Sequence, residues 1–354
     1  MPVRKLAALI AATPLVLACA AHGSAAASRG PVCPAPGTTL GCWEQLRPVG
    51  SGGFPAEPGS NDRPLWAPGK IPVTLFPVVG FGGDLWMVSQ THAYASRDGL
   101  AWTQHDKEDW GARIAQSFAF FRGRLWMLGG LDYRTKRALG DVWWSADGVH
   151  WQPSGAAGWP AREGAALFVF KGKLWLLGGT AEVNAHFEAV HMLNDVWSSE
   201  DGLHWTQVTS AAPWRARAEP RVAVLGDDAL YLLGGGAAAD VWRSEDGVHW
   251  TQLTAEAPWT ARHGYGGQAF DGRLWVFGGW VGPSTNALDD VWWSMDGASW
   301  TRLAEHAPWA PRSPRWVVFR DRLWIYSGKH TGAADSWGGD VWTMLPVHAA
   351  GAPP

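Results

Sequence analysis

One phrase recurs through most of the chain and restricts what it can fold into. It joins Leu-Trp-x-x-Gly-Gly, as at 125–130, to Asp-Val-Trp after a variable gap and then to Ser-x-Asp-Gly-x-x-Trp, as at 145–151. Degenerate copies of the first part are centred on Trp86, Trp126, Trp175, Tyr231, Trp275 and Trp324. Six copies at steps of roughly 40 to 56 residues indicate a repeat architecture before anything else.

Each unit reads as four short strands. In the second unit, 113–121 and 124–128 are apolar runs on either side of a short turn, which predicts a hairpin. Residues 141–145 form the third strand, and the Asp147-Gly148 turn leads to a fourth that begins at Trp151. We therefore predict an all-β fold, a six-bladed β-propeller built of four-stranded antiparallel blades.

The last unit lacks a fourth strand, and the start of the chain supplies one. Residues 322–327 and 340–344 give its second and third strands, but no Asp-Gly turn follows. Residues 42–46, Cys-Trp-Glu-Gln-Leu, parallel His-Trp-Thr-Gln-Leu at 249–253. We expect the N-terminal strand 41–48 to complete the sixth blade, which closes the ring and removes an exposed sheet edge.

The hydrophobic run, the Gly-Gly pair, the aromatic residue on the third strand and the Trp of the fourth resemble kelch repeats over residues 65–345. The resemblance implies the galactose oxidase-like kelch fold. Galactose oxidase uses copper with a Tyr crosslinked to Cys, and no Cys lies beyond residue 42 here, so we expect no such cofactor. Exported six-bladed kelch proteins also include N-acetylneuraminate mutarotases, which implies an acidic sugar and no metal.

The first 27 residues have the pattern of an export signal. Arg4 and Lys5 precede an apolar run, 6–18, that is too short to span a membrane. Val-Leu-Ala-Cys at 16–19 resembles a lipobox, so a lipoprotein anchored at Cys19 and a soluble protein cleaved near residue 27 are both open. Either route predicts a periplasmic or extracellular protein.

The remaining boundaries follow from composition. A Gly/Pro-rich segment, 28–64, contains the closing strand, and 346–354 form a C-terminal tail. Cys33 and Cys42 are the cysteines left after the signal, and an oxidising compartment favours a disulfide between them over two free thiols. The net charge of -3 without a basic stripe argues against nucleic acid, and against a membrane except through a lipid anchor. We expect a monomer.

Length variation is confined to one predicted face. The loop between the second and third strands ranges from four residues in the fourth unit to 15 in the third. The same face carries the connections between blades, each ending in an arginine three residues after a Trp. These are Arg113, Arg162, Arg217, Arg262 and Arg312. Each would open an innermost strand and present a guanidinium to the channel for a carboxylate, unless it only ties down its blade.

Residues beside these arginines differ between units and are the candidates for function. Glu163, Glu219 and His263 would serve as general acid and base, with a water-filled polar channel as the alternative. Of the 27 tryptophans, 21 recur in register and should fill the wedges between blades. The ligand-binding candidates outside the repeat are Gln116, Tyr265, Arg315 and Trp280, with Trp66, Trp144, Trp293, Trp316 and Trp337 also out of register.

Histidines in the loops suggest a metal site as a further hypothesis. No single loop has the close spacing of metal ligands, so such a site would have to be assembled across blades. The histidines are His92, His186, His191 and His330, with Glu182 and Glu188 nearby. We expect no cofactor. The sequence thus predicts an exported propeller that binds a small molecule or a protein partner, such as an anionic saccharide or peptide, on the loop face. A cofactor-independent mutarotase or epimerase is the alternative, followed by a metal-dependent enzyme.

Overall fold

The computed structural model describes residues 32–33, 41–47, 78–88, 92–106, 110–111, 113–132, 134–185, 188–236, 238–282, 286–330 and 340–346. The predicted signal and C-terminal tail lie outside these residues apart from Pro346, as does most of the Gly/Pro-rich segment. Within the described part, no helix has the length and apolar character needed to cross a membrane.

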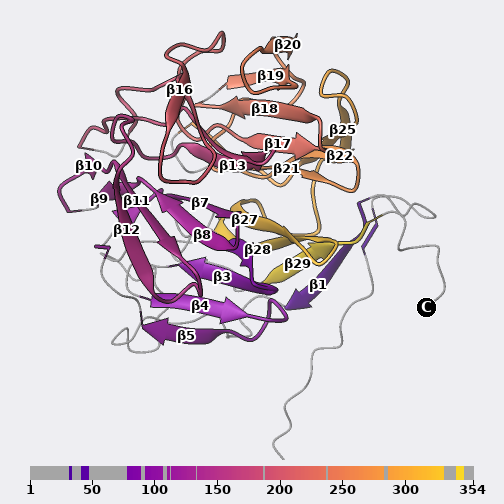
Figure 1. The fold of residues 1–354 in the computed structure, drawn as a ribbon. Coiled ribbons are helices and arrows are strands. Elements are labelled where there is room, and N and C mark those ends of the chain that lie inside the picture. The colour runs from indigo at the N-terminus through magenta and orange to yellow at the C-terminus, as the bar shows by residue number, and fades with distance from the viewer. Residues whose placement is uncertain are drawn as a thin grey trace, which may run out of the picture.

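Six four-stranded antiparallel sheets make up the fold (Figure 1), and we number them as blades in chain order. Blades 1 to 3 consist of β2 (Val78–Phe81), β3 (Asp84–Val88), β4 (His92–Ser96) and β5 (Thr103–Asp106); β7 (Ser117–Phe121), β8 (Arg124–Leu128), β11 (Asp141–Ser145) and β12 (Trp151–Ala156); and β13 (Ala166–Phe170), β14 (Lys173–Leu177), β15 (Val196–Ser199) and β16 (Thr206–Thr209).

Blades 4 to 6 consist of β17 (Val222–Leu225), β18 (Ala229–Gly235), β19 (Ala238–Ser244) and β20 (Thr251–Thr254); β21 (Gly266–Phe270), β22 (Arg273–Phe277), β25 (Val291–Ser294) and β26 (Thr301–Ala304); and β27 (Arg312–Phe319), β28 (Arg322–His330), β29 (Val341–Met344) and β1 (Trp43–Arg47). Two-residue strands add small sheets in the loops: β6 (Arg113–Ile114), β9 (Leu131–Asp132) and β10 (Arg137–Ala138) near blade 2, and β23 (Trp280–Val281) and β24 (Asn286–Ala287) near blade 5.

The innermost strands form a closed ring. In order, β2, β7, β13, β17, β21 and β27 each contact the next, and β27 contacts β2. The six sheets therefore surround a central channel, as the repeat predicts, and residues far apart in sequence meet around it.

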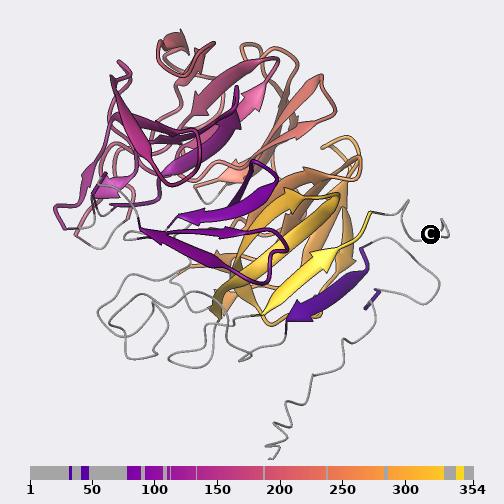
Figure 2. The same cartoon turned by 60° about the horizontal axis from the view of Figure 1, so that its bottom comes forward.

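The N-terminal strand lies where the sequence predicts it. β1 pairs antiparallel with β29, with Trp43 opposite Met344, and Figure 2 shows the indigo strand beside the yellow one. Trp43 packs edge-on against Trp309, with ring centroids 4.2 Å apart, as Trp300 packs against Trp259 in blade 5. A disulfide joins Cys33 and Cys42 beside this strand, as predicted.

The second-strand tryptophans fill the wedges between blades. The rings of Trp86, Trp126, Trp175 and Trp324 each lie against the glycine of the Asp-Gly turn in the next blade, as Trp126 does against Gly202. Gly202 has φ +83°, and a Cβ there would lie 2.4 Å from the Trp126 ring. Only glycine suits both the turn and this approach, which explains why Asp-Gly recurs with the tryptophan.

The inner strands differ from the prediction in one respect. The run 113–121 is two strands, β6 and β7, separated by Ala115 in the left-handed region at φ +53°. The equivalent residues in blades 3, 4 and 5 also have positive φ: Gly164, Glu219 and Gly264. Arg162, Arg217 and Arg262 therefore lie before their inner strands rather than at the first residue of those strands.

Candidate functional site

The repeated arginines are buried in ion pairs. Arg162 is 1% exposed, and its two terminal nitrogens donate to the two carboxylate oxygens of Asp195 at 2.7 Å each. Its Nε donates to the Pro160 carbonyl, and Nη1 also donates to that of Gly178. The same bidentate pair recurs as Arg113–Asp141, Arg217–Asp240, Arg262–Asp290 and Arg312–Asp340.

This geometry corresponds to the scaffold alternative rather than to a ring of free cations. The aspartate comes from the Asp-Val-Trp segment, so each pair ties the connection entering a blade to the third strand of that blade. None of the five arginines lines the channel cavity. The five arginines are therefore not part of the cavity wall that a ligand would contact.

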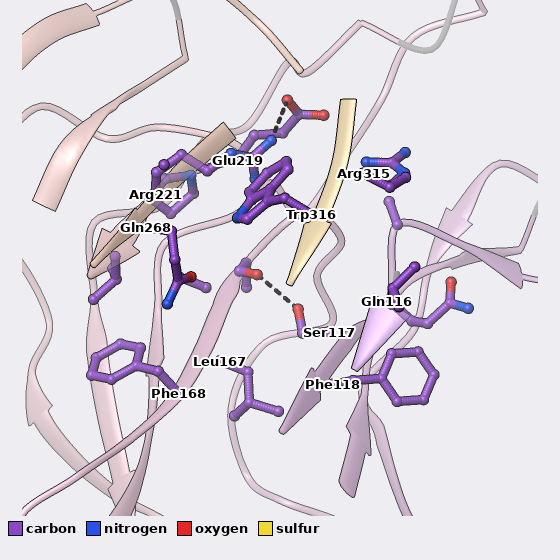
Figure 3. Close-up of a pocket in the computed structure, with 18 residues that line it drawn as sticks. Gln116, Ser117, Phe118, Leu167, Phe168, Glu219, Arg221, Gln268, Arg315 and Trp316 are labelled. Atoms are coloured by element: carbon purple, nitrogen blue, oxygen red, sulfur yellow. Dashed lines mark hydrogen bonds and ion pairs between the residues drawn. The ribbon is translucent and has the colours of Figure 1, made fainter. Parts of the chain in front are cut away.

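A cavity of about 270 Å³ occupies the central channel. Residues from the inner strands of all six blades line it, from Val78 in blade 1 to Trp316 in blade 6. Figure 3 shows Glu219, Arg221 and Arg315 toward one end of this cavity, with Gln116 and Gln268 on opposite sides. Among the candidates from the sequence, the fold thus brings together Gln116, Glu219, Arg315 and Trp316.

Arg221 is held rigidly across the boundary between blades 4 and 5. Its guanidinium lies 5.3 Å from the ring centre of Tyr265 and 5.0 Å from that of Trp316, and its Nε donates to the Tyr265 carbonyl at 2.9 Å. Gly267 makes room for it, because a Cβ there would lie 2.8 Å from the Arg221 Cβ. Stacking between two rings fixes the cation before any ligand arrives.

Glu219 has a left-handed backbone conformation, and the equivalent residue in each of the two neighbouring blades is glycine. Its φ is +50°, as against +61° at Gly164 and +57° at Gly264. Its carboxylate accepts a hydrogen bond from the Gly264 amide at 3.2 Å and lies 3.6 Å from Nη2 of Arg221. Ala115 holds the same position in blade 2 at φ +53°, so the conformation belongs to the repeat, and what distinguishes Glu219 is the carboxylate that it carries there.

Two further polar groups in the cavity lack partners within the described residues. Gln116 is 5% exposed, and neither atom of its amide makes a hydrogen bond. The Nε of Arg315 is buried and also unpaired. Burial, followed by the nearby charge of Arg221, lowers the pKa of Arg315 to about 10, so the group stays cationic at neutral pH. Buried polar groups of this kind usually have a partner, and here both line a cavity.

The remaining candidates lie beside the cavity rather than on its wall. The Tyr265 hydroxyl donates to the Leu233 carbonyl, and burial raises the pKa of that hydroxyl. Because the Tyr265 ring also lies against Arg221, this tyrosine supports the arginine. His263 stacks on Trp280 with ring centroids 6.2 Å apart. Glu163 pairs its backbone with Thr180. Burial, followed by the charge of Glu219, raises the pKa of Glu163 to about 8.

The raised pKa of Glu163 predicts a pH-dependent stability. Between an ordinary value of 4.5 and about 8, the folded protein keeps a proton that the unfolded chain releases, so the free energy of unfolding should fall as pH rises through this window. Glu163→Gln should remove this slope and stabilise the protein by roughly 2–4 kcal/mol at pH 9, with little effect at pH 4. Urea unfolding of both proteins from pH 4 to 9 measures the difference, and parallel curves would contradict the assignment.

The metal hypothesis gains no support from the described residues. They contain no group of three or more His, Cys, Asp or Glu side chains arranged to hold a metal ion. His186 and the side chain of His330 lie outside the described part. His191 and Glu182 use their backbone carbonyls to accept from the Thr180 hydroxyl.

Known proteins share this repeat and this architecture. A family model described as the Kelch motif matches residues 261–305, which cover blade 5. The solved structure of YjhT aligns with a TM-score of 0.63 and 16% sequence identity, over 77% of this chain and 94% of YjhT. The chain is a kelch-repeat β-propeller. No curated protein sequence matches it, and the identity to YjhT is low enough that the likeness shows the fold alone.

In this kelch propeller, the polar residues of the cavity wall that sequence analysis missed are Arg221 and Gln268. A signal for Arg221 was present: four residues after the repeated arginine, blades 2, 3 and 5 have Ser117, Ala166 and Gly266. The same position in blade 6 is Trp316, so Arg221 brings a charge to a position that is small or aromatic in these other blades. Propellers of this kind bind or transform ligands, and the channel is where this one departs from its own repeat.

Proposed function

We propose that this propeller binds a small molecule or peptide bearing a carboxylate, with the anion held between Arg221 and Arg315. The carrying observation is the charge balance of the cavity wall. Two guanidinium groups face one carboxylate, Glu219, and the neighbouring Glu163 is neutral at pH 7 because of its raised pKa. An excess positive charge in a partly enclosed cavity favours an anionic ligand.

The unpaired groups fit the same ligand. A carboxylate offers two oxygens to the planar fork of Arg315, and the Gln116 amide can donate to it or to a neighbouring group. The stacked Arg221 loses little conformational freedom on binding, which favours affinity. Glu219 then positions Arg221 instead of contacting the anion.

We further propose that the protein works outside the cytoplasm. The signal-like pattern of residues 1–27 and the Cys33–Cys42 disulfide support export. The Cys19 lipobox leaves both a membrane-anchored and a soluble form open, and mass spectrometry of the mature N-terminus distinguishes them.

The binding proposal predicts a large effect of Arg315. In calorimetric titrations with glucuronate and phenylacetate, Arg315→Gln should weaken binding about tenfold or more, because a charge-assisted bidentate contact is lost. Arg215→Gln is the matched control, since Arg215 is exposed on a connection between blades and should leave affinity unchanged. The proposal fails if the acids bind no better than glucose and phenylacetamide, their neutral counterparts.

A second candidate is a cofactor-independent enzyme acting on an acidic sugar. The specific observation in its favour is the Glu163 carboxyl group, which its raised pKa keeps neutral at pH 7 and which lies near a second carboxyl group, that of Glu219. Such pairs divide the roles of general acid and general base. Anomer exchange of glucuronate or N-acetylneuraminate, followed by NMR, should then be accelerated and should be lost in Glu163→Gln while binding persists. Binding without acceleration would leave the first proposal standing alone.

A further inference from the structure

The channel cavity has an apolar end as well as a charged one. The fourth residue from the end of each inner strand carries no polar side-chain group in five of the six blades. In blade 6 it is a tryptophan, whose indole nitrogen is its one polar atom. In blade order these are Val78, Phe118, Leu167, Val222, Gly267 and Trp316, and all six line the cavity. The repeat thus builds a nonpolar ring directly next to the unrepeated charges.

Figure 3 shows Phe118, Leu167 and Phe168 gathered at the end of the cavity opposite Glu219, Arg221 and Arg315. These apolar side chains are only partly buried, so part of their surface faces the cavity. Phe118 is held in place by an edge-on contact with Trp151, at 5.9 Å between ring centroids. The apolar end is therefore a formed surface available to a ligand.

Polar partners are scarce at that end. The hydroxyl of Ser117, which lies between the two ends in Figure 3, donates to the Ala165 carbonyl at 2.7 Å. Figure 3 shows Gln116 and Gln268 between the two ends as well, so the hydroxyls of a sugar placed against Phe118, Leu167 and Phe168 would find polar partners only on the side facing the charged end. Each hydroxyl left without a partner costs free energy. An aryl or branched alkyl group would instead gain by leaving water.

We propose that the ligand is an amphiphilic carboxylate, whose acid group binds at Arg221 and Arg315 and whose aryl or branched alkyl group lies among Phe118, Leu167 and Phe168. The inference rests on the proposed carboxylate site and adds the class of its ligand. Both a free aryl acid and the carboxyl terminus of a peptide ending in an apolar residue have this chemistry.

Calorimetric titration of the folded protein separates charge from apolarity with three probes: phenylacetate, phenylacetamide and glucuronate. Phenylacetate should bind at least about tenfold more tightly than glucuronate, since burying a ring contributes that much or more. It should also bind at least about tenfold more tightly than phenylacetamide, which lacks the charge that the two guanidinium groups bind. Glucuronate binding as tightly as phenylacetate would overturn the inference and leave the carboxylate site intact. Phenylacetamide binding as tightly as phenylacetate would overturn the carboxylate site itself. A fourth probe, the peptide Gly-Gly-Phe, distinguishes a peptide terminus from a free aryl acid. Tighter binding of Gly-Gly-Phe than of phenylacetate indicates a peptide ligand, and tighter binding of phenylacetate indicates a free acid.

A variant of the apolar end provides an independent test. Leu167→Asn should weaken phenylacetate about tenfold and change glucuronate less than about twofold. Leu203→Asn makes the same change in an exposed turn of the same blade and should affect neither acid. If Leu167→Asn does not fold, Leu167→Ala should weaken phenylacetate in the same direction without adding a polar group. Unchanged phenylacetate affinity in a folded Leu167 variant contradicts the inference.

Discussion

Replacing Arg162 by Met is expected to lower the free energy of unfolding by about 3–5 kcal/mol. The substitution removes four hydrogen bonds and leaves the carboxylate of Asp195, whose side chain is 7% exposed, without its cationic partner. Urea unfolding followed by tryptophan fluorescence measures the loss. The size of the effect comes mainly from the isolated charge and less from the absent contact.

The double variant Arg162→Met, Asp195→Leu should recover most of that loss, because it removes the buried charge together with its partner. Arg215→Met, on the exposed part of the next connection, should stay within about 0.5 kcal/mol of the wild type. If Arg162→Met were as mild as Arg215→Met, the scaffold role of the repeated arginines would be wrong.

Deletion of residues 38–48 is expected to abolish the cooperative unfolding transition. The deletion removes β1, leaves β29 as an open edge and takes away Trp43, which is 2% exposed against Trp309. A ring that lacks one strand of its sixth blade also loses the link between its first and last repeats. Scanning calorimetry reports the transition directly, and an unchanged melting temperature would contradict the closure.

Point variants in β1 separate packing from surface charge. Trp43→Ala should cost about 3–5 kcal/mol because it empties a buried aromatic site. Glu44→Ala removes only a partly exposed ion pair with Arg322, at 3.1 Å, and should cost less than about 1 kcal/mol. Similar losses from both variants would indicate that β1 matters for a reason other than the contact between Trp43 and Trp309.

Much of the fold could be predicted because each repeated residue has one structural task. The Trp126 position fills a wedge, Gly202 allows its approach, and the missing fourth strand of the last unit pointed to 41–48. The break at Ala115 could not be predicted, since nothing in an Arg-Ile-Ala-Gln run forces a left-handed residue. It arises from tertiary contacts, in which the Gly164 amide of the next blade donates to the Ala115 carbonyl.

The site was less predictable because sequence proximity to an arginine says little about which side chain reaches the channel. Glu219 and Arg315 were found, yet the five arginines that drew attention are fixed in ion pairs by aspartates whose partners the sequence left open. Arg221 enters the cavity only because Gly267, on another blade, leaves space for it. Such a contact between distant residues becomes visible once the ring is assembled.

The most direct test of the account compares two arginines four residues apart in blade 4. Arg217→Met should lose roughly 3–5 kcal/mol of stability but, where it is still folded, should bind phenylacetate and glucuronate as the wild type does. Arg221→Met should lose no more than about 2 kcal/mol, the value of its stacking contacts, and should weaken the binding of the carboxylates about tenfold or more. Wild-type affinity in Arg221→Met, or lost affinity in a stable Arg217→Met, would contradict the division between a repeated scaffold and an unrepeated binding channel.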